Sequence, residues 1–282
     1  MKEKSSKRIV LLSMVAIIMV LLVGCRVEYS ESNKVEAPNW TSDGKIVFVK
    51  EHSKWKTTYN TLGEDCEQIE DELILMECNW DGSEKREISK ITEYWSAIST
   101  SSSGDWVVIG AARGDNSRMY VMKTDGSELH SFTYGLYPDL SPDGSKIVYA
   151  RKGEGIWIMN RDGSDDHQIL VSGGYPSWSP DDTLIAYGSL KTHIVKLNGE
   201  EIKYYERYGF LDWGPKNSNS IIVGSFFDLG ECIKINILTG ESDTLNVRGI
   251  TKCSPDGQFF IGYDGKYYVI DRNGTNKHYI EP

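Results

Sequence analysis

A short turn motif recurs along this chain, and it constrains the fold more than any other feature. Its fullest form, Ser-Pro-Asp-Gly, stands at 141–144 and 254–257, and variants stand at 41–44, 101–104, 179–182 and 214–217. The steps between successive turns are 60, 40, 38, 35 and 40 residues, so only the first step is long. Recurrence at such steps is the signature of a repeat architecture.

Each turn is followed by the same series of short elements. An apolar segment rich in β-branched and aromatic residues comes first, as in KIVYA at 146–150, and a second one follows, as in IWIMN at 156–160. An Asp-Gly or Asn-Gly type turn then precedes a short last segment, as at 161–164 and 167–170. These are strand and hairpin signals, and no sustained helical period appears after the first 25 residues. The repeat therefore predicts four short antiparallel strands, used six times.

A four-stranded sheet of this kind has two faces to bury, and six arranged radially bury them against one another. We therefore predict an all-β chain: a six-bladed β-propeller of four-stranded antiparallel blades over 36–282. The expected blades are 36–90, 91–133, 134–172, 173–206, 207–247 and 248–282.

The motif also resembles a known repeat. Pro176-Ser177-Trp178-Ser179-Pro180-Asp181 and Pro138-Asp139-Leu140-Ser141-Pro142-Asp143-Gly144 are similar to the TolB-type six-bladed propeller repeat, whereas 101–103 and 214–216 depart from it. The resemblance implies the same propeller, but TolB carries an additional N-terminal α/β domain, so a Tol-Pal role is not implied. Similar repeats occur in peptidase propellers and polysaccharide lyases, and the fold alone does not fix a function.

The first 25 residues carry a different signal. A basic start with Lys2, Lys4, Lys7 and Arg8 precedes an apolar run from Ile9 to Val23. This is typical of a secretory signal peptide and is short for a membrane span. The ending Leu22-Val23-Gly24-Cys25 resembles a bacterial lipobox, which implies cleavage before Cys25 and lipidation of its thiol. We expect a signal peptide at 1–24 and a lipidated Cys25 with a linker over 25–35; an uncleaved anchor helix is the alternative. Either way, the domain is expected outside the cytoplasm, attached to a bacterial membrane.

Charge narrows the range of partners. The formal net charge is −10, and cleavage before Cys25 leaves 27 basic and 40 acidic residues, formally −13. A nucleic-acid surface would carry a basic patch, so nucleic acid is excluded as a partner. Anionic lipid is likewise a poor ligand for such a surface, so the lipid on Cys25 has to provide the membrane attachment.

Four cysteines follow Cys25, namely Cys66, Cys78, Cys232 and Cys253. None has C-x-x-C spacing, which disfavours a zinc site. Cys66 and Cys78 flank the one long insertion, and an oxidising compartment would permit a disulfide between them. The alternative is that all four are small buried apolar side chains.

No reactive constellation is evident in the sequence. The aspartates of the turns, Asp43, Asp143, Asp181 and Asp256, are interpreted as turn chemistry, since an Asp there accepts hydrogen bonds from nearby backbone amides. His130, His167 and His278 occupy the same repeat position in different blades and are too far apart for one metal ion. We therefore expect no metal, no cofactor and no catalytic residue.

The predicted innermost strands offer a better candidate site. The residue before the motif tryptophan is polar in every blade: Asn39, Ser99, Asp139, Ser177, Asp212 and Lys252. Repeat geometry places these six in a ring near the axis. They form either a water-filled channel lining or the polar floor of a ligand or peptide pocket.

The insertion at 50–71 is expected on the propeller face that also carries the connections between blades. Aromatic residues gather in or beside the loops of that face, and we select Trp55, Tyr59, Trp95, Tyr137, Tyr175 and Tyr208 as a candidate partner surface. Exposed aromatic residues on loops suggest recognition, although they also fill gaps between blades.

These features favour a non-catalytic lipoprotein scaffold that binds an envelope protein, peptide or glycan on the face that carries the 50–71 insertion. One alternative is a polysaccharide lyase or glycosidase that uses channel-mouth carboxylates such as Asp139 and Asp212, since glycosidases need two such groups. Another is a purely structural envelope protein.

Overall fold

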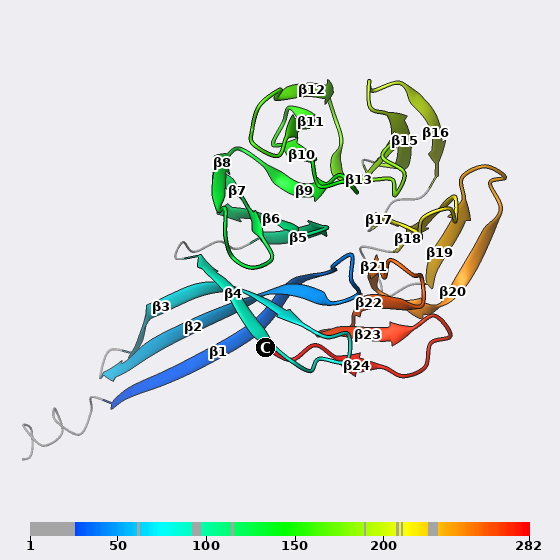
Figure 1. The fold of residues 1–282 in the computed structure, drawn as a ribbon. Coiled ribbons are helices and arrows are strands. Elements are labelled where there is room, and N and C mark those ends of the chain that lie inside the picture. The colour runs from blue at the N-terminus through cyan, green and yellow to red at the C-terminus, as the bar shows by residue number, and fades with distance from the viewer. Residues whose placement is uncertain are drawn as a thin grey trace, which may run out of the picture.

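The computed structural model describes residues 26–60, 63–91, 97–113, 116–188, 190–206, 209, 211–224 and 231–282. The predicted signal peptide and Cys25 lie outside these residues. Within them, the chain forms 24 strands in six four-stranded antiparallel sheets, and each sheet takes its strands from one continuous segment (Figure 1). The predicted all-β six-bladed propeller is therefore confirmed.

The first three blades use twelve strands in chain order. They are β1 (Arg26–Trp40), β2 (Ile46–Asn60), β3 (Gly63–Cys78), β4 (Arg86–Ile91), β5 (Ala97–Ser103), β6 (Trp106–Arg113), β7 (Asn116–Lys123), β8 (His130–Thr133), β9 (Leu136–Leu140), β10 (Lys146–Arg151), β11 (Gly155–Asn160) and β12 (His167–Leu170). The last three blades use β13 (Gly174–Trp178), β14 (Leu184–Gly188), β15 (Thr192–Lys196), β16 (Glu201–Tyr205), β17 (Leu211–Trp213), β18 (Ser220–Val223), β19 (Glu231–Asn236), β20 (Ser242–Arg248), β21 (Ile250–Cys253), β22 (Phe259–Tyr263), β23 (Tyr267–Asp271) and β24 (His278–Tyr279).

The first strand of each blade is the innermost one. β1, β5, β9, β13, β17 and β21 contact one another in that order around the axis, and β21 contacts β1 to close the ring. Closure needs no strand shared between the first and last blades, because β21 to β24 form a complete sheet. Side chains join the two blades instead, with Phe48 of β2 packed in one cluster with Ile261 and Val269 of blade 6.

The core is divided among the contacts between blades. Six hydrophobic clusters form among the described residues, each drawing buried side chains from two neighbouring blades. Val108 of β6 packs with Ile147 of β10, for example, and Val148 of β10 packs with Ile185 of β14. The middle strands are buried on both faces, which explains their continuous apolar runs in the sequence.

The repeated turn is built as the sequence predicted. The hydroxyl of Ser141 donates to Asp143 Oδ1 at 2.6 Å and accepts the N–H of Lys146 at 2.9 Å. Ser179 with Asp181 and Ser254 with Asp256 repeat the first contact at 2.7 and 2.6 Å. These hydroxyls are buried and their partners close the turn, so the repeated serine and aspartate are explained by local hydrogen bonding.

Two predictions about the start of the domain were wrong. Residues 26–35, predicted as a linker, belong to β1, and β1 pairs with β2 from Arg26↔Tyr59 inward. The insertion at 50–71, predicted as a loop, lengthens β2 and β3, which pair from Asn60↔Gly63 to Ile46↔Cys78. The sequence signal was hidden because both faces of these segments are polar, so they lack the alternation of a half-buried strand.

Candidate functional site

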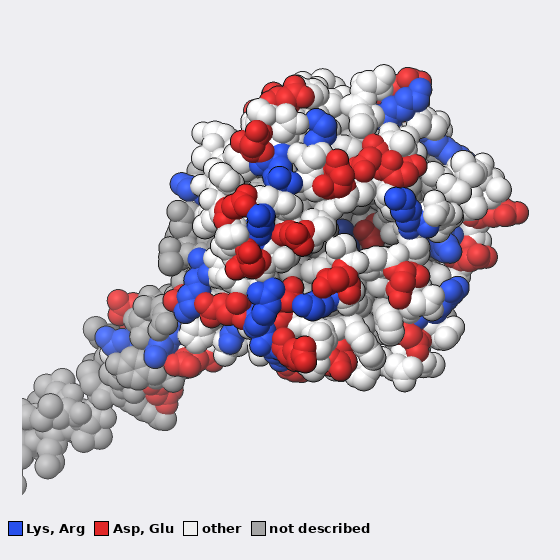
Figure 2. Space-filling model, in the orientation of Figure 1, with Lys and Arg blue, Asp and Glu red and all other residues white. Residues whose placement is uncertain are grey.

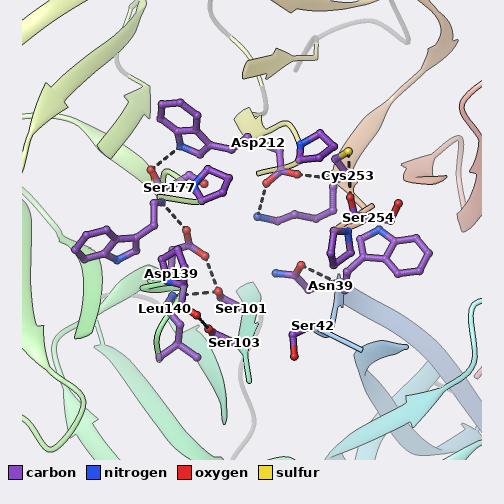
Figure 3. Close-up of a pocket in the computed structure, with 18 of the residues that line it drawn as sticks. Asn39, Ser42, Ser101, Ser103, Asp139, Leu140, Ser177, Asp212, Cys253 and Ser254 are labelled. Carbon is purple, nitrogen blue, oxygen red and sulfur yellow. Dashed lines mark hydrogen bonds and ion pairs between the residues drawn. The ribbon is translucent and has the colours of Figure 1, made fainter. Parts of the chain in front are cut away.

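A pocket of about 380 Å³ lies at the centre of the ring, where the innermost strands end at the Ser-Pro-Asp-Gly turns. Figure 2 shows it as a central hollow with acidic and basic groups inside it. The predicted ring residues in its wall are Asn39, Asp139, Ser177, Asp212 and Lys252, and Figure 3 shows several of them facing the same space. Thus one residue each from blades 1, 3, 4, 5 and 6 is brought together as predicted.

The sixth ring position is held by Ser101 rather than Ser99. Ser101 pairs with Val108, as Asp139 pairs with Val148 in the next blade. Ser99 pairs with Gly110, two residues further from the turn, and the side chain of Ser99 is not among those described. The error arose from the turn: Ser103 pairs directly with Trp106, so blade 2 has a two-residue turn where blade 3 has a longer one.

The ring side chains fasten neighbouring blades to each other. Asp139 Oδ2 in blade 3 accepts the backbone N–H of Trp178 in blade 4 at 2.7 Å. Asp212 Oδ2 in blade 5 accepts the N–H of Cys253 in blade 6 at 2.7 Å. An innermost strand has no neighbour on its axial edge, so its amides there need side-chain acceptors. We call these contacts the inter-blade clasps.

Two further contacts extend this arrangement around the ring. The hydroxyl of Ser101 accepts the N–H of Leu140 at 3.1 Å and donates to Asp139 Oδ1. In blade 1, Asn39 Oδ1 accepts the N–H of the adjacent Trp40 at 2.8 Å. The residue preceding that position around the ring is Lys252, whose ammonium has no acceptor to offer. Asn39 therefore provides, from its own strand, the hydrogen-bond acceptor that a carboxylate of the preceding blade provides in blades 4 and 6.

Lys252 and Asp212 form an ion pair in the pocket wall, with Nζ and Oδ1 3.3 Å apart. The two side chains are 23% and 14% exposed, so solvent screens the pair only in part. Burial raises the pKa of Asp212, and Lys252 and the Cys253 amide oppose that shift incompletely. Burial alone would lower the pKa of Lys252, but the carboxylates of Asp212 and Asp139 raise it overall, so the ammonium stays charged.

The predicted partner surface is only partly assembled. Tyr137 and Tyr175 lie together, with ring centroids 4.1 Å apart and a hydroxyl contact of 3.3 Å, and burial raises the pKa of Tyr175 to about 12. Trp55 and Tyr59 lie on the extended part of β2 instead. Trp95 and Tyr208 are outside the described residues. Of the four residues that the structure describes, Tyr137 and Tyr175 are brought together.

The tyrosine pair sits on a strained backbone. Tyr137 and Tyr175 have φ values of 51° and 52°, and each precedes a proline. A bulky residue is disfavoured in this left-handed region, and a following proline disfavours helical conformations further. Both strands bulge at this point, between Val148 and Ala150 in one pairing and between Gly174 and Ser177 in the other. The strained bulge turns the two rings toward each other.

The predicted disulfide between Cys66 and Cys78 is wrong. Both residues lie on β3, twelve positions apart in a continuous strand, which corresponds to about 40 Å. A disulfide needs Cα atoms within about 7 Å. Cys66 is exposed, whereas Cys78 is buried and its burial raises the pKa of the thiol to about 11.

Two kinds of feature are absent from the described residues. No group of three or more His, Cys, Asp or Glu side chains there is placed to hold a metal ion. No helix there is long and apolar enough to cross a membrane.

No known protein family and no curated protein matches this sequence. Solved structures do match its fold. TolB from Acinetobacter baumannii superposes with a TM-score of 0.59 and 12% identity, covering 88% of this chain and 78% of that one.

The chain has a TolB-like six-bladed propeller fold. A chain of the mitotic checkpoint complex is also similar, with a TM-score of 0.53, 11% identity, and coverage of 84% of this chain and 87% of that one. The β-propeller domain of the Trilobed protease from Pyrococcus furiosus matches with a TM-score of 0.44 and 17% identity, over 66% of this chain and 72% of that one. At these identities, the likeness concerns the fold alone.

Proposed function

We propose that this chain is a lipid-anchored, extracytoplasmic propeller that binds a protein, peptide or glycan partner through its central pocket, without catalysis. The observation that carries the proposal is the chemistry of the pocket wall. The carboxylates of Asp139 and Asp212 are engaged in inter-blade clasps, whereas Lys252 has three donors and one described contact, to Asp212. The wall therefore offers an ammonium to a partner group that carries acceptor oxygens.

The pocket suits the end of a chain rather than a large flat surface. Its volume of about 380 Å³ matches a few residues or sugar units, and it is open to solvent at the turn face. Polar side chains dominate the ring, so specificity would come from hydrogen bonds and charge. The basic and apolar start of the chain and the lipobox-like end at Cys25 support a location of this pocket outside the cytoplasm.

A crosslinking capture from intact cells tests the pocket. The tagged full-length chain is compared with Lys252→Met, and with Lys216→Met as the matched control, because Lys216 is an exposed lysine at the pocket rim. We expect the first variant to lose its crosslinked partner by about tenfold or more and the control to retain it, since a lost charge-assisted hydrogen bond is worth about 1.5–3 kcal/mol. Equal capture by both variants, with both folded, contradicts the pocket proposal.

Lipid attachment has its own test. Cells supplied with a clickable fatty acid should label the wild-type chain and leave Cys25→Ser unlabelled. Labelling that survives in Cys25→Ser contradicts attachment at that thiol.

One observation favours a second candidate function. Asp139 and Asp212 line the same pocket and burial raises the pKa of Asp212, and a glycosidase uses two carboxyl groups, one of which has a raised pKa. The double variant Asp139→Asn/Asp212→Asn decides the matter on a panel of polysaccharides. Activity in the wild type that disappears in the folded double variant supports this candidate, and activity that persists, or is absent from both proteins, counts against it.

A further inference from the structure

Blade 1 carries an extension that the described residues of the other blades lack. Residues 26–35 of β1, 50–60 of β2 and 63–72 of β3 form a three-stranded ribbon, which we call the arm, and Figure 1 shows it projecting well beyond the ring. At its far end, Arg26 pairs with Tyr59, and Tyr59 pairs with Glu64. At about 3.3 Å per residue, the ten residues of β1 in the arm span about 33 Å.

The described side chains of the arm form no apolar core. Among the described side chains, the buried hydrophobic residues of the chain stop at its root, at Val35 and Leu73. Polar pairs join the strands beyond that point. Lys54 contacts Glu31 at 3.1 Å, and the Tyr59 hydroxyl donates to Glu28 at 3.1 Å. A ribbon whose described side chains are joined by polar pairs is unlike the core of a protein interface, which is depleted of charge and rich in aromatic residues.

The arm also connects the predicted anchor to the pocket. Arg26, the first residue of β1, follows Cys25 directly, so a lipid on that thiol would sit at the far end of the arm. The same strand runs inward to Asn39 and Trp40, which line the pocket. No flexible linker separates the anchor position from the propeller, because β1 pairs with β2 from its first residue.

The charge of the arm opposes its lying flat on a membrane. It carries five basic and nine acidic residues, a formal charge of −4, and six of the acids are on β3. Glu64, Asp65 and Glu67 are exposed near the far end. Bacterial and other anionic lipid surfaces repel such a strand over roughly a Debye length, about 8–10 Å.

We propose that the arm is a rigid stalk whose far end meets a lipid bilayer and which holds the propeller about 30 Å away from it. The proposal rests on the lipid attachment at Cys25 put forward above. Its consequence is that the pocket is presented to a partner beyond the headgroup layer, instead of being pressed against the membrane. The polar character of the arm then follows from its task, since a spacer has to be solvated on every side.

Neutron reflectometry on a supported bilayer of phosphatidylcholine and phosphatidylglycerol tests this directly. The full-length lipidated chain is expected to show a layer of low protein density, about 30 Å thick, between the headgroups and the propeller. A shortened variant lacks 28–33, 52–57 and 66–72, which joins the pairs Val27↔Thr58 and Lys34↔Glu51 in register. It should bring the propeller closer by about 20 Å. Unchanged spacing in the folded shortened variant overturns the proposal.

Two controls separate the stalk from the anchor. A chain tethered to nickel-chelating lipid by a histidine tag after Pro282, next to the buried Ile280, should lie against the bilayer with no intervening layer. A chain with the tag in place of Cys25 should stand off like the lipidated one. Identical profiles for the two tethers overturn the stalk. If the tag at position 25 gives the layer but the full-length chain does not attach to lipid, the stalk is supported and the anchoring is refuted.

Discussion

The Asp139 carboxylate in blade 3 accepts the backbone N–H of Trp178 in blade 4 at 2.7 Å, on the wall of the central pocket. The contact joins two innermost strands that share no backbone ladder. Asp139 resembles a catalytic or ligand-binding group, but this contact gives it a structural role. Asp212 has the same role through the N–H of Cys253.

Replacing Asp139 by alanine should lower the free energy of unfolding by about 1–3 kcal/mol, because the Trp178 amide loses its acceptor in a buried position. Asp139→Asn should cost less, since one amide oxygen remains. Ser177→Ala is the matched control at the next ring position, where the backbone carbonyl, not the hydroxyl, accepts from Trp213 Nε1. Urea denaturation measures all three, and equal losses for Asp139→Ala and Ser177→Ala would remove the clasp assignment.

Lys252→Met should destabilise the chain more as pH rises. The raised pKa of Asp212 rises further once the Lys252 ammonium is removed. A carboxyl group whose pKa is higher in the folded state than in the unfolded state contributes stability at pH values below its unfolded-state pKa. That contribution is lost as pH rises through its folded-state pKa. The deficit against the wild type should therefore be small near about pH 4 and grow toward about pH 7.

The double variant Lys252→Met/Asp212→Asn is the companion experiment. It should recover part of the loss, because breaking a buried pair costs more than removing both partners. Thermal melts across pH provide the measurement, and a deficit that does not depend on pH would be the contrary result.

Asp143 predicts the opposite pH response. Hydrogen bonds from Ser141, and then from the amide and hydroxyl of Ser145, hold its pKa below the usual range. Its contribution is present above the unfolded pKa and is lost as pH falls through the folded one. Asp143→Asn should cost about 0.5–1 kcal/mol at neutral pH, since the group is exposed, and should match the wild type in strong acid. A constant difference between the two melting curves at every pH would contradict this account.

Thiol chemistry tests the separation of Cys66 from Cys78. In a chain with Cys25→Ser, one thiol should react rapidly with a soluble disulfide reagent, and it should be Cys66, the exposed one. Cys78 and Cys232 are buried and should react only after unfolding. Cys66→Ser should abolish the rapid phase. Loss of two thiols together on mild oxidation, with the fold intact, would be the contrary finding.

The sequence predicted the ring position well where the first residue of the turn could be recognised. Asn39, Asp139, Ser177, Asp212 and Lys252 could be identified because each stands a fixed distance before its turn. Ser101 was missed because blade 2 shortens that turn, and in a run of serines the register cannot be read from residue type. Strand pairing across the sheet was needed to identify it.

The arm and the inter-blade clasps could not be predicted from the sequence, for a different reason. Periodic apolar residues report burial, and the described side chains of the arm beyond its root are mostly polar, so its strands left no such signal. Likewise, nothing in the local sequence indicates that Asp139 accepts from Trp178, 39 positions away, whereas Ser141 and Asp143 bond within their own turn.

The sequence by itself therefore determined the number of blades, their strand content and the chemistry of their turns, because these depend on contacts between residues close together in the chain. Only the tertiary structure decided that two ring carboxylates are clasps, that Lys252 pairs with Asp212 in the pocket wall and that Cys66 and Cys78 lie far apart. Those features depend on how six sheets meet around one axis and on strand registers that local propensity does not specify.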